Sequence, residues 1–442
     1  MNRAGGSRAR RTGKPGRVGA SGDAAINYRD ALSWLYSLQR FGIKLGLENI
    51  QRLLEECCSG VCVKCPALGT SASTFKIIHV AGTNGKGSVC AMIDSICRAQ
   101  GYRTGLFTSP HLVTFRERIR VNGEMVSEKA VADGLTSIRN LVANWDPHPT
   151  FFEVVTALAL KHFSDTRVEI VILETGLGGR LDATNAIQSD VSVITPIDFD
   201  HEEWLGKTIS EIAAEKAGII KQGVPVVSAP QGIESEKVIQ ARVAECHAPL
   251  EFATKPYDET PIALAGANQK QNAALGIAAL RAAKIDIDDA AIARGLGSID
   301  WPARFQRWDE RTIIDGAHNP AAARALAGTW REIFGDRRAT LVLAILSDKN
   351  LRRICEALAP ISKFVLLPKI RSERAADPEM LAQIFSTITP TLPCSTTPSI
   401  ARALELAQAN PDPILITGSL HFAGEVLAHL RGEPAAFEEC AQ

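Results

Sequence analysis

A glycine-rich stretch in the first quarter of the chain carries the residue types of a phosphate-binding loop. The stretch is Ala81-Gly-Thr-Asn-Gly-Lys-Gly-Ser88, and the apolar run before it, at 75–80, predicts a buried strand. Apolar residues then recur at helical spacing over 89–97. In this order of strand, loop and helix, the loop amides and the helix N-terminus face one anion. The sequence therefore predicts a nucleotide site, with Lys86 on the β- and γ-phosphates and Ser88 on Mg²⁺.

The spacing of this loop differs from that of the common P-loop. Two residues rather than four separate Gly82 from Gly85-Lys86, and Gly87 precedes Ser88. The alternative interpretation is a flexible glycine turn without a ligand. The flanking strand and helix favour nucleotide binding.

Length, charge and cysteine usage indicate a cytoplasmic enzyme with two domains. The chain has 442 residues, which is long for one hydrophobic core. Lysine plus arginine balances aspartate plus glutamate at 49 each, so no global field attracts nucleic acid. No apolar run approaches the ~20 residues needed to span a bilayer. We therefore expect neither a nucleic-acid nor a membrane partner, and six scattered cysteines are typical of reduced cytoplasmic proteins.

Two segments stand apart from the rest of the chain. Residues 1–24 are basic, with no acid before Asp23, and we interpret them as a disordered tail. An organelle-targeting presequence or an anion-binding arm are the alternatives. Four cysteines cluster between Cys57 and Cys65; their Cys62-x-x-Cys65 spacing suits zinc, but the adjacent first pair does not. We interpret the cluster as a surface insertion, with a metal or redox role as the alternative.

Apolar runs typical of buried parallel strands alternate with helical patterns along the remaining chain. We predict an α/β fold in which a P-loop ATPase domain with a central, mainly parallel sheet precedes a smaller Rossmann-like domain. The predicted ranges are 1–24 for the tail, 25–299 for the ATP-binding domain and 300–442 for the C-terminal domain. The predicted strands are 168–173, 191–195, 224–228, 311–315, 339–344, 364–367 and 413–417, and the predicted helices are 208–217, 320–333, 350–359, 400–409 and 419–430.

Polar residues that can hold a cation follow several predicted strands, at the sheet edge where open α/β folds bind ligands. Glu174 directly follows the run at 168–173, and a carboxylate beside a P-loop is an expected ligand of Mg²⁺ or water. The arrangement recurs in Ser109-Pro-His111, in Asp200-His201 and in Asp315-Gly-Ala-His318.

These motifs resemble those of folylpolyglutamate synthases and of the bifunctional dihydrofolate synthase/folylpolyglutamate synthases, within the Mur ligase superfamily. The resemblance extends from about Tyr28 to Leu430. The motifs that carry it are Gly82-Thr-Asn-Gly-Lys-Gly-Ser88, Thr108-Ser-Pro-His-Leu112 with Arg116-Glu-Arg-Ile-Arg120, Glu174-x-Gly-Leu-Gly-Gly-Arg-Leu-Asp-Ala-Thr-Asn185, Asp200-His201 with Trp204-Leu-Gly206, Glu215-Lys-Ala-Gly-Ile219 and Asp315-x-Ala-His-Asn-Pro320.

The resemblance implies a role for each matching position. Lys216 matches a lysine that is carbamylated in this family and then holds a second metal ion. Asp315 or His318 would orient or deprotonate the incoming amine, and the sequence leaves both open. The implied phosphate contacts are Gly85, Lys86, Gly87 and Ser88; the implied Mg²⁺ ligands are Ser88, Ser109, Glu174, His201 and Lys216; the further nucleotide contacts are Asn272, Arg304 and Asp315; and the catalytic group is Lys86, Lys216, Asp315 and His318.

The resemblance also implies a pterin-side pocket. Part of it would come from the stretch Gly42–Leu47, in which Lys44 stands where the bifunctional enzymes carry an acid. Whether dihydropteroate is accepted therefore stays open. The other implied pocket residues are Phe151, Phe152, Glu153, Val154, Leu181, Asp182 and Ala183.

The implied activity is ATP-dependent ligation of L-glutamate to the γ-carboxylate of folates through an acyl phosphate, and ligation of glutamate to dihydropteroate. The implied cofactors are ATP and two Mg²⁺ ions, with a monovalent cation as a further candidate, and we expect a monomer. One alternative is a Mur-type ligase for another acid, such as a cell-wall peptide precursor. The other is a non-catalytic P-loop module, which would carry a guanine-reading Asn-Lys-x-Asp motif that the sequence lacks.

Overall fold

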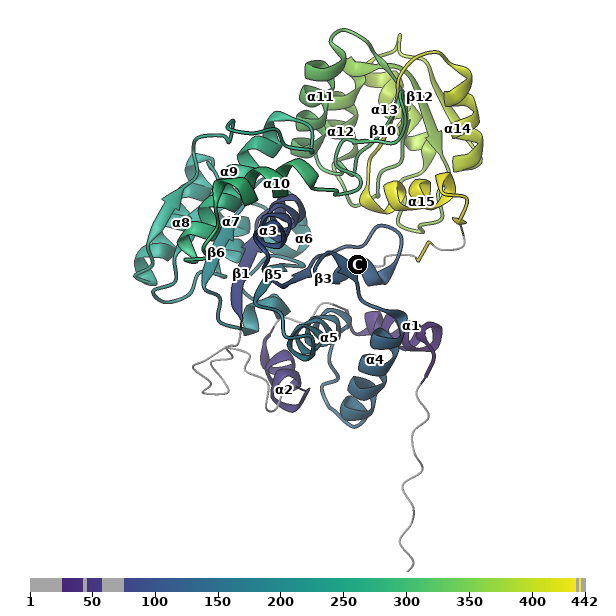
Figure 1. Cartoon of the computed structure of the whole chain (residues 1–442). Coiled ribbons are helices and arrows are strands. Elements are labelled where there is room, and N and C mark those ends of the chain that lie inside the picture. Colours follow the sequence, from purple (N-terminus) through teal and green to yellow (C-terminus); the bar gives the residue numbers. More distant parts are fainter. Residues whose placement is uncertain (1–25, 43–45, 58–74, 435–436, 439–442) are drawn as a thin grey trace, which may run out of the picture.

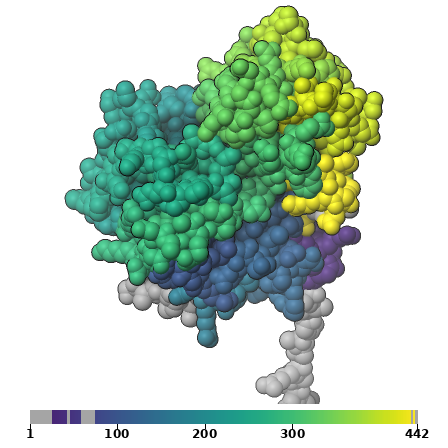
Figure 2. Space-filling model, turned by 45° about the horizontal axis from the view of Figure 1, so that its top comes forward, coloured from purple at the N-terminus to yellow at the C-terminus, as the bar shows by residue number. Residues whose placement is uncertain are grey.

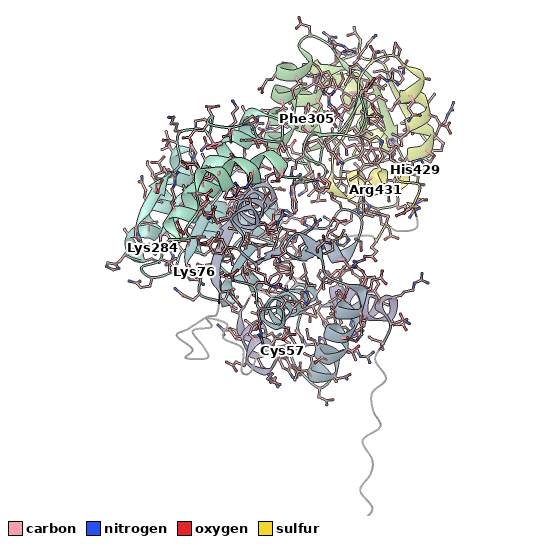
Figure 3. All side chains as sticks on the ribbon, in the orientation of Figure 1. Cys57, Lys76, Lys284, Phe305, His429 and Arg431 are labelled. Carbon is pink, nitrogen blue, oxygen red and sulfur yellow. The ribbon has the colours of Figure 1, made fainter. Side chains whose placement is uncertain are left out.

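The computed structural model describes residues 26–42, 46–57, 75–434, 437 and 438. Two α/β units make up this part of the chain, each built on its own sheet (Figure 1). The predicted basic tail, Lys44 and three of the four clustered cysteines lie outside the described residues. Cys57 is described; it is a half-buried free thiol at the end of α2, in the lower part of the first unit (Figure 3).

The first sheet has eight strands in the order β4-β3-β2-β5-β1-β6-β7-β8. From β2 to β8 neighbouring strands are parallel, whereas β3 and β4 add an antiparallel edge. The strands are β1 (Lys76–Ala81), β2 (Thr104–Phe107), β3 (Ile119–Val121), β4 (Glu124–Met125), β5 (Ile170–Glu174), β6 (Val191–Ile194), β7 (Val226–Ser228) and β8 (Leu250–Phe252).

Helices cover both faces of this sheet because its central strands are apolar on both sides. In β1, Ile77 belongs to the core on one face and Ile78 to the core on the other. The first face is covered by α1 (Tyr28–Ser37), α2 (Glu48–Cys57), α4 (Glu128–Val142) and α5 (Phe151–Asp165), and the second by α3 (Lys86–Gln100), α9 (Ala267–Ala282) and α10 (Asp289–Ser298). The remaining helices of this unit are α7 (Ile209–Ala217) and α8 (Ile233–Glu245), with the short η1 (Leu38–Phe41), η3 (Phe115–Arg118), η4 (Ala183–Ala186) and α6 (Glu202–Leu205).

The second sheet has six strands in the order β13-β12-β11-β14-β10-β9, parallel except for β9. Its strands are β9 (Gln306–Arg307), β10 (Thr312–Ile314), β11 (Ala339–Leu343), β12 (Ser362–Pro368), β13 (Cys394–Thr397) and β14 (Ile414–Thr417). One face packs against α11 (Pro320–Phe334), α12 (Leu351–Leu358) and α13 (Pro378–Ile388), the other against α14 (Ile400–Ala409) and α15 (Leu420–Leu430), with η5 (Ala359–Ile361) after α12.

The predicted fold class is confirmed, as is the alternation of strands and helices in both halves. Among the elements that the sequence analysis did not predict are the antiparallel strands β3, β4 and β9, the pair α13–β13, and the helices α4, α5, α8, α9 and α10. The predicted domain boundary falls between α10, which ends at Ser298, and β9, which begins at Gln306. No helix in the described part of the chain is long and apolar enough to cross a membrane.

The two units touch closely where α15 of the second approaches the loop that follows β2 in the first. Val113 of that loop is buried in the same apolar cluster as Phe422 and Val426 of α15. Gly424 of α15 lies so close to the carbonyl of Leu112 that a Cβ atom at this position would overlap it. Glycine is therefore required here by the close approach of two backbones.

Candidate active site

A cavity of about 1540 Å³ lies between the two units and takes its wall from both. It opens at the carboxyl ends of the strands of both sheets, where the sequence analysis expects the site. Val154 does not reach it: its side chain is fully buried in the core under α5, because successive helical residues point to different sides. The candidate residues that line the cavity are Gly85, Lys86, Gly87, Ser88, Ser109, Phe151, Phe152, Glu153, Glu174, Leu181, Asp182, Ala183, His201, Lys216, Asn272, Arg304, Asp315 and His318.

The glycine-rich loop lines the cavity from Gly82 to Ser88, while the amides of Thr83 and Asn84 donate to the carbonyl oxygen of Pro196. Gly85 has a φ of +92°, and a Cβ atom there would lie 2.7 Å from Oδ1 of Asn272. Glycine is thus needed both for the backbone conformation and for the approach of α9. The helix α3 begins directly after it, at Lys86, whose Nζ lies 3.4 Å from the carbonyl oxygen of Thr83. This geometry is that of an anion site at a helix N-terminus.

Two buried hydroxyls and one buried carboxylate meet beside this loop. Within the described part of the chain, the hydroxyls of Ser88 and Ser109 have no hydrogen-bond partner. Glu174 lies at the end of β5, and its Oε2 accepts the amide N–H of Ser109 at 3.1 Å. Burial raises the pKa of Glu174, and the positive charge of Lys86 opposes that rise. Buried polar atoms without partners are uncommon, and these oxygens are ligands that Mg²⁺ prefers.

The chemistry of this donor set fits Mg²⁺ bound together with phosphate. No group of three or more His, Cys, Asp and Glu side chains among the described residues is placed to hold a metal by itself. Mg²⁺ commonly keeps water and takes only one or two carboxylates plus substrate phosphates. Glu174 with Ser88 and Ser109 matches that pattern, and His201 lines the same cavity.

Lys216 lies near the end of α7 with its side chain buried. Only 4% of the residue is exposed, and Nζ donates to the carbonyl oxygen of Gly82 at 3.0 Å. Burial, and after it the positive charge of Lys86, lower the pKa of Lys216 to about 7. A substantial share of this amine is therefore neutral near neutral pH, which is the form that reacts with electrophiles.

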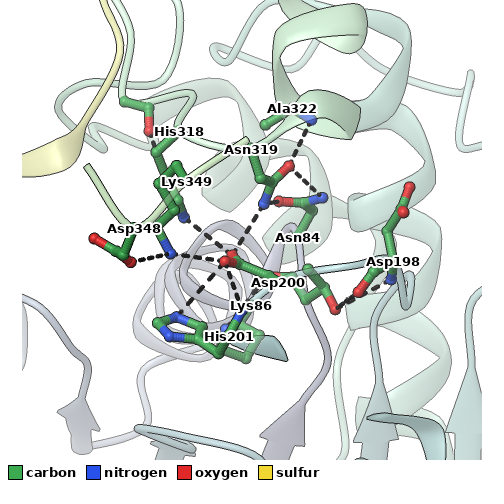
Figure 4. A network of polar contacts seen from close by, with 12 residues as sticks. Asn84, Lys86, Asp198, Asp200, His201, His318, Asn319, Ala322, Asp348 and Lys349 are labelled. Carbon is green, nitrogen blue, oxygen red and sulfur yellow. Dashed lines mark hydrogen bonds and ion pairs between the residues drawn. The ribbon is translucent and has the colours of Figure 1, made fainter. Parts of the chain in front are cut away.

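Asp200 joins the two units through a set of polar contacts (Figure 4). Its Oδ1 lies 2.7 Å from Nζ of Lys349, and both side chains are 8% exposed. Its Oδ2 accepts from Nδ2 of Asn319 at 3.2 Å and lies 3.5 Å from Nε2 of His318. Burial alone would raise the pKa of Asp200, but the hydrogen bond and charge of His318, with the charges of His201 and Lys349, hold it well below its usual value. Asp200 is therefore an anion that faces Lys349 and His318 of the second unit.

The phosphate loop contacts the second unit directly through Asn84. The carboxamides of Asn84 and Asn319 exchange hydrogen bonds, of 3.3 Å from the first and 2.9 Å from the second. Asn319 is also the N-cap of α11, where its Oδ1 accepts the N–H of Ala322 at 2.9 Å. The side chain of Asn319 thus contacts the first turn of α11, the phosphate loop and Asp200 at the same time. The sequence analysis did not assign a role to Asn84, Asn319 or Lys349, although Lys349 follows β11 at the same sheet edge as Asp315.

Asp315 and His318 play different structural parts. The two carboxylate oxygens of Asp315 accept the backbone N–H groups of Phe305 at 2.7 Å and Ala317 at 2.8 Å, so the acid fixes the start of the second unit. Nδ1 of His318 lies 2.9 Å from the carbonyl oxygen of Gly316, which places the proton on Nδ1. Nε2 then faces Asp200, and His318 is better placed than Asp315 to exchange a proton.

Two acids of the predicted pterin-side pocket shape its backbone. Glu153 closes the capping box of α5, where its Oε2 accepts the N–H of Thr150 at 2.7 Å. Asp182 accepts the amides of Gly176 and Leu177, each at 2.9 Å, and burial raises its pKa against those hydrogen bonds. Both residues line the cavity while holding the loops that form it.

Comparison with known families and structures agrees with this architecture. The Mur ligase middle domain matches residues 80–228, and the Mur ligase, glutamate ligase domain matches residues 303–420. The fold and the site therefore define a Mur ligase. Folylpolyglutamate synthase of Mycobacterium tuberculosis, complexed with ADP and AMPPCP, is 32% identical and superposes with a TM-score of 0.81 over 92% of this chain and 99% of its own.

Two further relatives narrow the class. Escherichia coli FolC in complex with DHPP and ADP is 30% identical, with a TM-score of 0.80 over 93% of this chain and 99% of its own. Dihydrofolate synthase/folylpolyglutamate synthase of Bacillus subtilis (strain 168) is 34% identical over 441 residues, covering 91% of this chain and 99% of the relative. The chain belongs to the dihydrofolate synthase/folylpolyglutamate synthase family.

Proposed function

We propose that this protein is an ATP-dependent ligase that adds L-glutamate to the γ-carboxylate of folates and also joins glutamate to dihydropteroate. The observation that carries the proposal is one cavity in which the phosphate loop, with Ser88, Ser109 and Glu174, faces Asp315 and His318 of the second unit. The names and ligands of its relatives support the same activity.

The chemistry begins with activation of the carboxylate. A carboxylate and an amine do not condense in water, so the γ-phosphoryl group of ATP is transferred to the carboxylate oxygen, forming an acyl phosphate and ADP. Lys86 and the loop amides position that group and stabilise its charge. Mg²⁺, when bound, supplies further neutralisation of phosphate charge, and Ser88, Ser109, Glu174 and His201 would hold it.

The second step forms the amide. The neutral amine of glutamate attacks the acyl carbon, the bond to the phosphate oxygen breaks, and inorganic phosphate leaves with that electron pair. Nε2 of neutral His318 can take the proton that the amine loses, and Asp200, which faces Nε2, can stabilise the imidazolium that forms. We propose that residues 25–299 bind the nucleotide, that Asn272, Arg304 and Asp315 complete its site, and that residues 300–442 form the glutamate ligase domain.

Lys216 belongs in this proposal as a carbamate. Its neutral amine would attack CO₂, forming an N–C bond and releasing a proton, and the product is a carboxylate-like anion. That anion would suit a second Mg²⁺, whereas an ammonium next to Lys86 would repel one. The buried position of Lys216 beside the phosphate loop supports the assignment. A cytoplasmic location and a monomeric state stay predictions.

An assay with three acceptors tests the function. The purified chain is given ATP, Mg²⁺ and radiolabelled glutamate with a reduced folate monoglutamate, with dihydropteroate, or with a UDP-linked cell-wall peptide precursor. We expect label in the folate and in the dihydropteroate product. Label only in the folate would show that dihydropteroate is not a substrate. Label only in the UDP-linked product would show that the protein is a cell-wall ligase instead.

A further inference from the structure

Two residues beyond α15 cross from the second unit to the first. They are Phe437 and Glu438, which we call the strap. Figure 2 shows the yellow end of the chain lying against blue and purple atoms of the first unit. The strap contacts the loop that follows β2. It thus touches an element that carries the proposed metal ligand Ser109.

Glu438 binds this loop through backbone and side chain. Its amide donates to the carbonyl oxygen of Val113 at 2.8 Å. Its Oε2 accepts the hydroxyls of Thr114 at 3.1 Å and Tyr28 at 3.3 Å, and the backbone N–H of Phe115. Hydrogen bonds to an ionised carboxylate are stronger than those between neutral groups. One carboxylate therefore joins the second unit to both the loop and α1.

The carbonyl oxygen of Glu438 fixes the imidazole of His111. Nε2 of His111 lies 3.0 Å from this oxygen, and Nδ1 accepts from Nε of Arg118 at 2.9 Å. Nε2 must then carry the proton, because Nδ1 is an acceptor and a carbonyl oxygen cannot donate. His111 is thus a neutral donor to the strap, two residues after Ser109.

Phe437 anchors the other end of the strap in the second unit. Its ring is 8% exposed and meets the ring of His421 edge-on, with centroids 5.0 Å apart. It belongs to the apolar cluster that also holds Val113 and α15. His111 and His421 both line the cavity, one from each unit. The strap therefore contacts one cavity-lining histidine from each unit.

We infer that Phe437 and Glu438 are positioning residues, which keep the second unit docked on the first and hold the Ser109 loop in place for metal-dependent phosphoryl transfer. The inference rests on the proposed function. When only the docked arrangement is active, the measured kcat/KM is proportional to the fraction of molecules in which the two units are docked. Loss of several charge-assisted hydrogen bonds corresponds to roughly a tenfold change or more.

The experiment compares strap variants with a chain shortened immediately after Glu438, which keeps the strap. Glu438→Ala and Phe437→Ala are each expected to lower kcat/KM for glutamate about tenfold, to raise the Mg²⁺ concentration for half-maximal rate, and to enlarge the radius of gyration in small-angle X-ray scattering. The shortened chain should match the full chain in all three.

A double-mutant cycle separates positioning from simple stabilisation. Tyr28→Phe removes one donor to Glu438, so its effect on kcat/KM should disappear in the Glu438→Ala background. Folded strap variants with wild-type kcat/KM, Mg²⁺ dependence and radius of gyration would overturn the inference, as would a lower melting temperature with unchanged kinetics. An inactive full chain would instead overturn the proposed function.

Discussion

Lys86 is the first residue of α3, and its ammonium faces the cavity from the phosphate loop. Replacement by alanine should lower kcat by roughly 10³, since a charge clamp on a transferring phosphoryl group is worth several kcal/mol. Steady-state ligation measures the loss. Lys129→Ala is the control, because this lysine is 84% exposed on α4. A Lys86→Ala enzyme with a tenth of the wild-type rate would contradict the assignment.

Glu174 can be tested without changing its shape. Glu174→Gln removes the charge that would attract Mg²⁺, so half-maximal activity should require more Mg²⁺ and part of the rate should return at high concentration. The measurement is a Mg²⁺ titration of the ligation rate. If the titration is unchanged, Glu174 serves only as the acceptor for the amide of Ser109.

The proposed carbamate on Lys216 can be tested by substitution and by crystallography. Lys216→Ala should be nearly inactive, and short carboxylates such as formate or acetate should restore part of the rate, because they can fill the space with an anion. In parallel, a crystal of the ATP-bound, CO₂-equilibrated protein should show a branched group on Nζ. Electron density for an unmodified ammonium would show that Lys216 is an ordinary buried lysine and would contradict the carbamate.

At the scale of single residues, the sequence was informative where a side chain follows a strand. Glu174 and Ser109 were predicted because strand ends locate the ligand edge before any coordinates are known. Val154, which the motif places beside the pocket, has its side chain in the core, because a motif gives neighbours in sequence but not the direction of each side chain on a helix. Lys349 was missed because a lysine after a strand is usually solvated, and only the fold places it against Asp200.

Helix ends allow a prediction at the scale of elements. Lys284, labelled in Figure 3, follows the end of α9 with a φ of +53°, and Ile285 N–H bonds to the carbonyl of Leu280 at 3.1 Å. This position favours glycine, and the lysine is exposed. Lys284→Gly should therefore raise the free energy of unfolding by about 1 kcal/mol.

The reverse change supplies the matched control. Gly101 follows α3 with a φ of +101° and has no atom within 4 Å of a Cβ position. Gly101→Ala should lower the free energy of unfolding by about the same 1 kcal/mol. Urea midpoints of both variants measure the effects. If both substitutions changed the free energy of unfolding in the same direction, backbone conformation would not be what determines stability at these helix ends.

Several of the elements that escaped prediction lack the pattern on which prediction depends. β13 reads Cys-Ser-Thr-Thr and lies at the edge of its sheet, so it has no apolar run to mark it. β3 and β4 are three and two residues long; β3 is held by pairing with β2, and β4 by pairing with β3. Long buried strands such as β5 and β11 were found because both faces are apolar.

Docking of the two units can be tested with two lysines of the second unit. Lys349 and Lys363 form ion pairs of 2.7 and 2.9 Å, but their side chains are 8% and 60% exposed. Lys349→Met leaves a buried carboxylate without its cation, which costs about 3 kcal/mol or more, so kcat/KM should fall roughly a hundredfold. Lys363→Met should change it less than about fivefold. If Lys349→Met and Lys363→Met lowered kcat/KM to a similar extent, the burial of the Lys349 ion pair would not be the cause of the loss.

The division of the cavity wall between two units also bears on how efficiently ATP is used. An acyl phosphate reacts with water as well as with an amine, and only a closed wall keeps water away from it. A chain whose second unit stands apart would still present its phosphate loop to ATP, yet part of its product would be lost to hydrolysis. The ratio of phosphate released to glutamate incorporated should thus be about one in the docked enzyme and should rise as docking weakens. Wasted turnover, rather than slow turnover, would be the first sign of a loosened molecule.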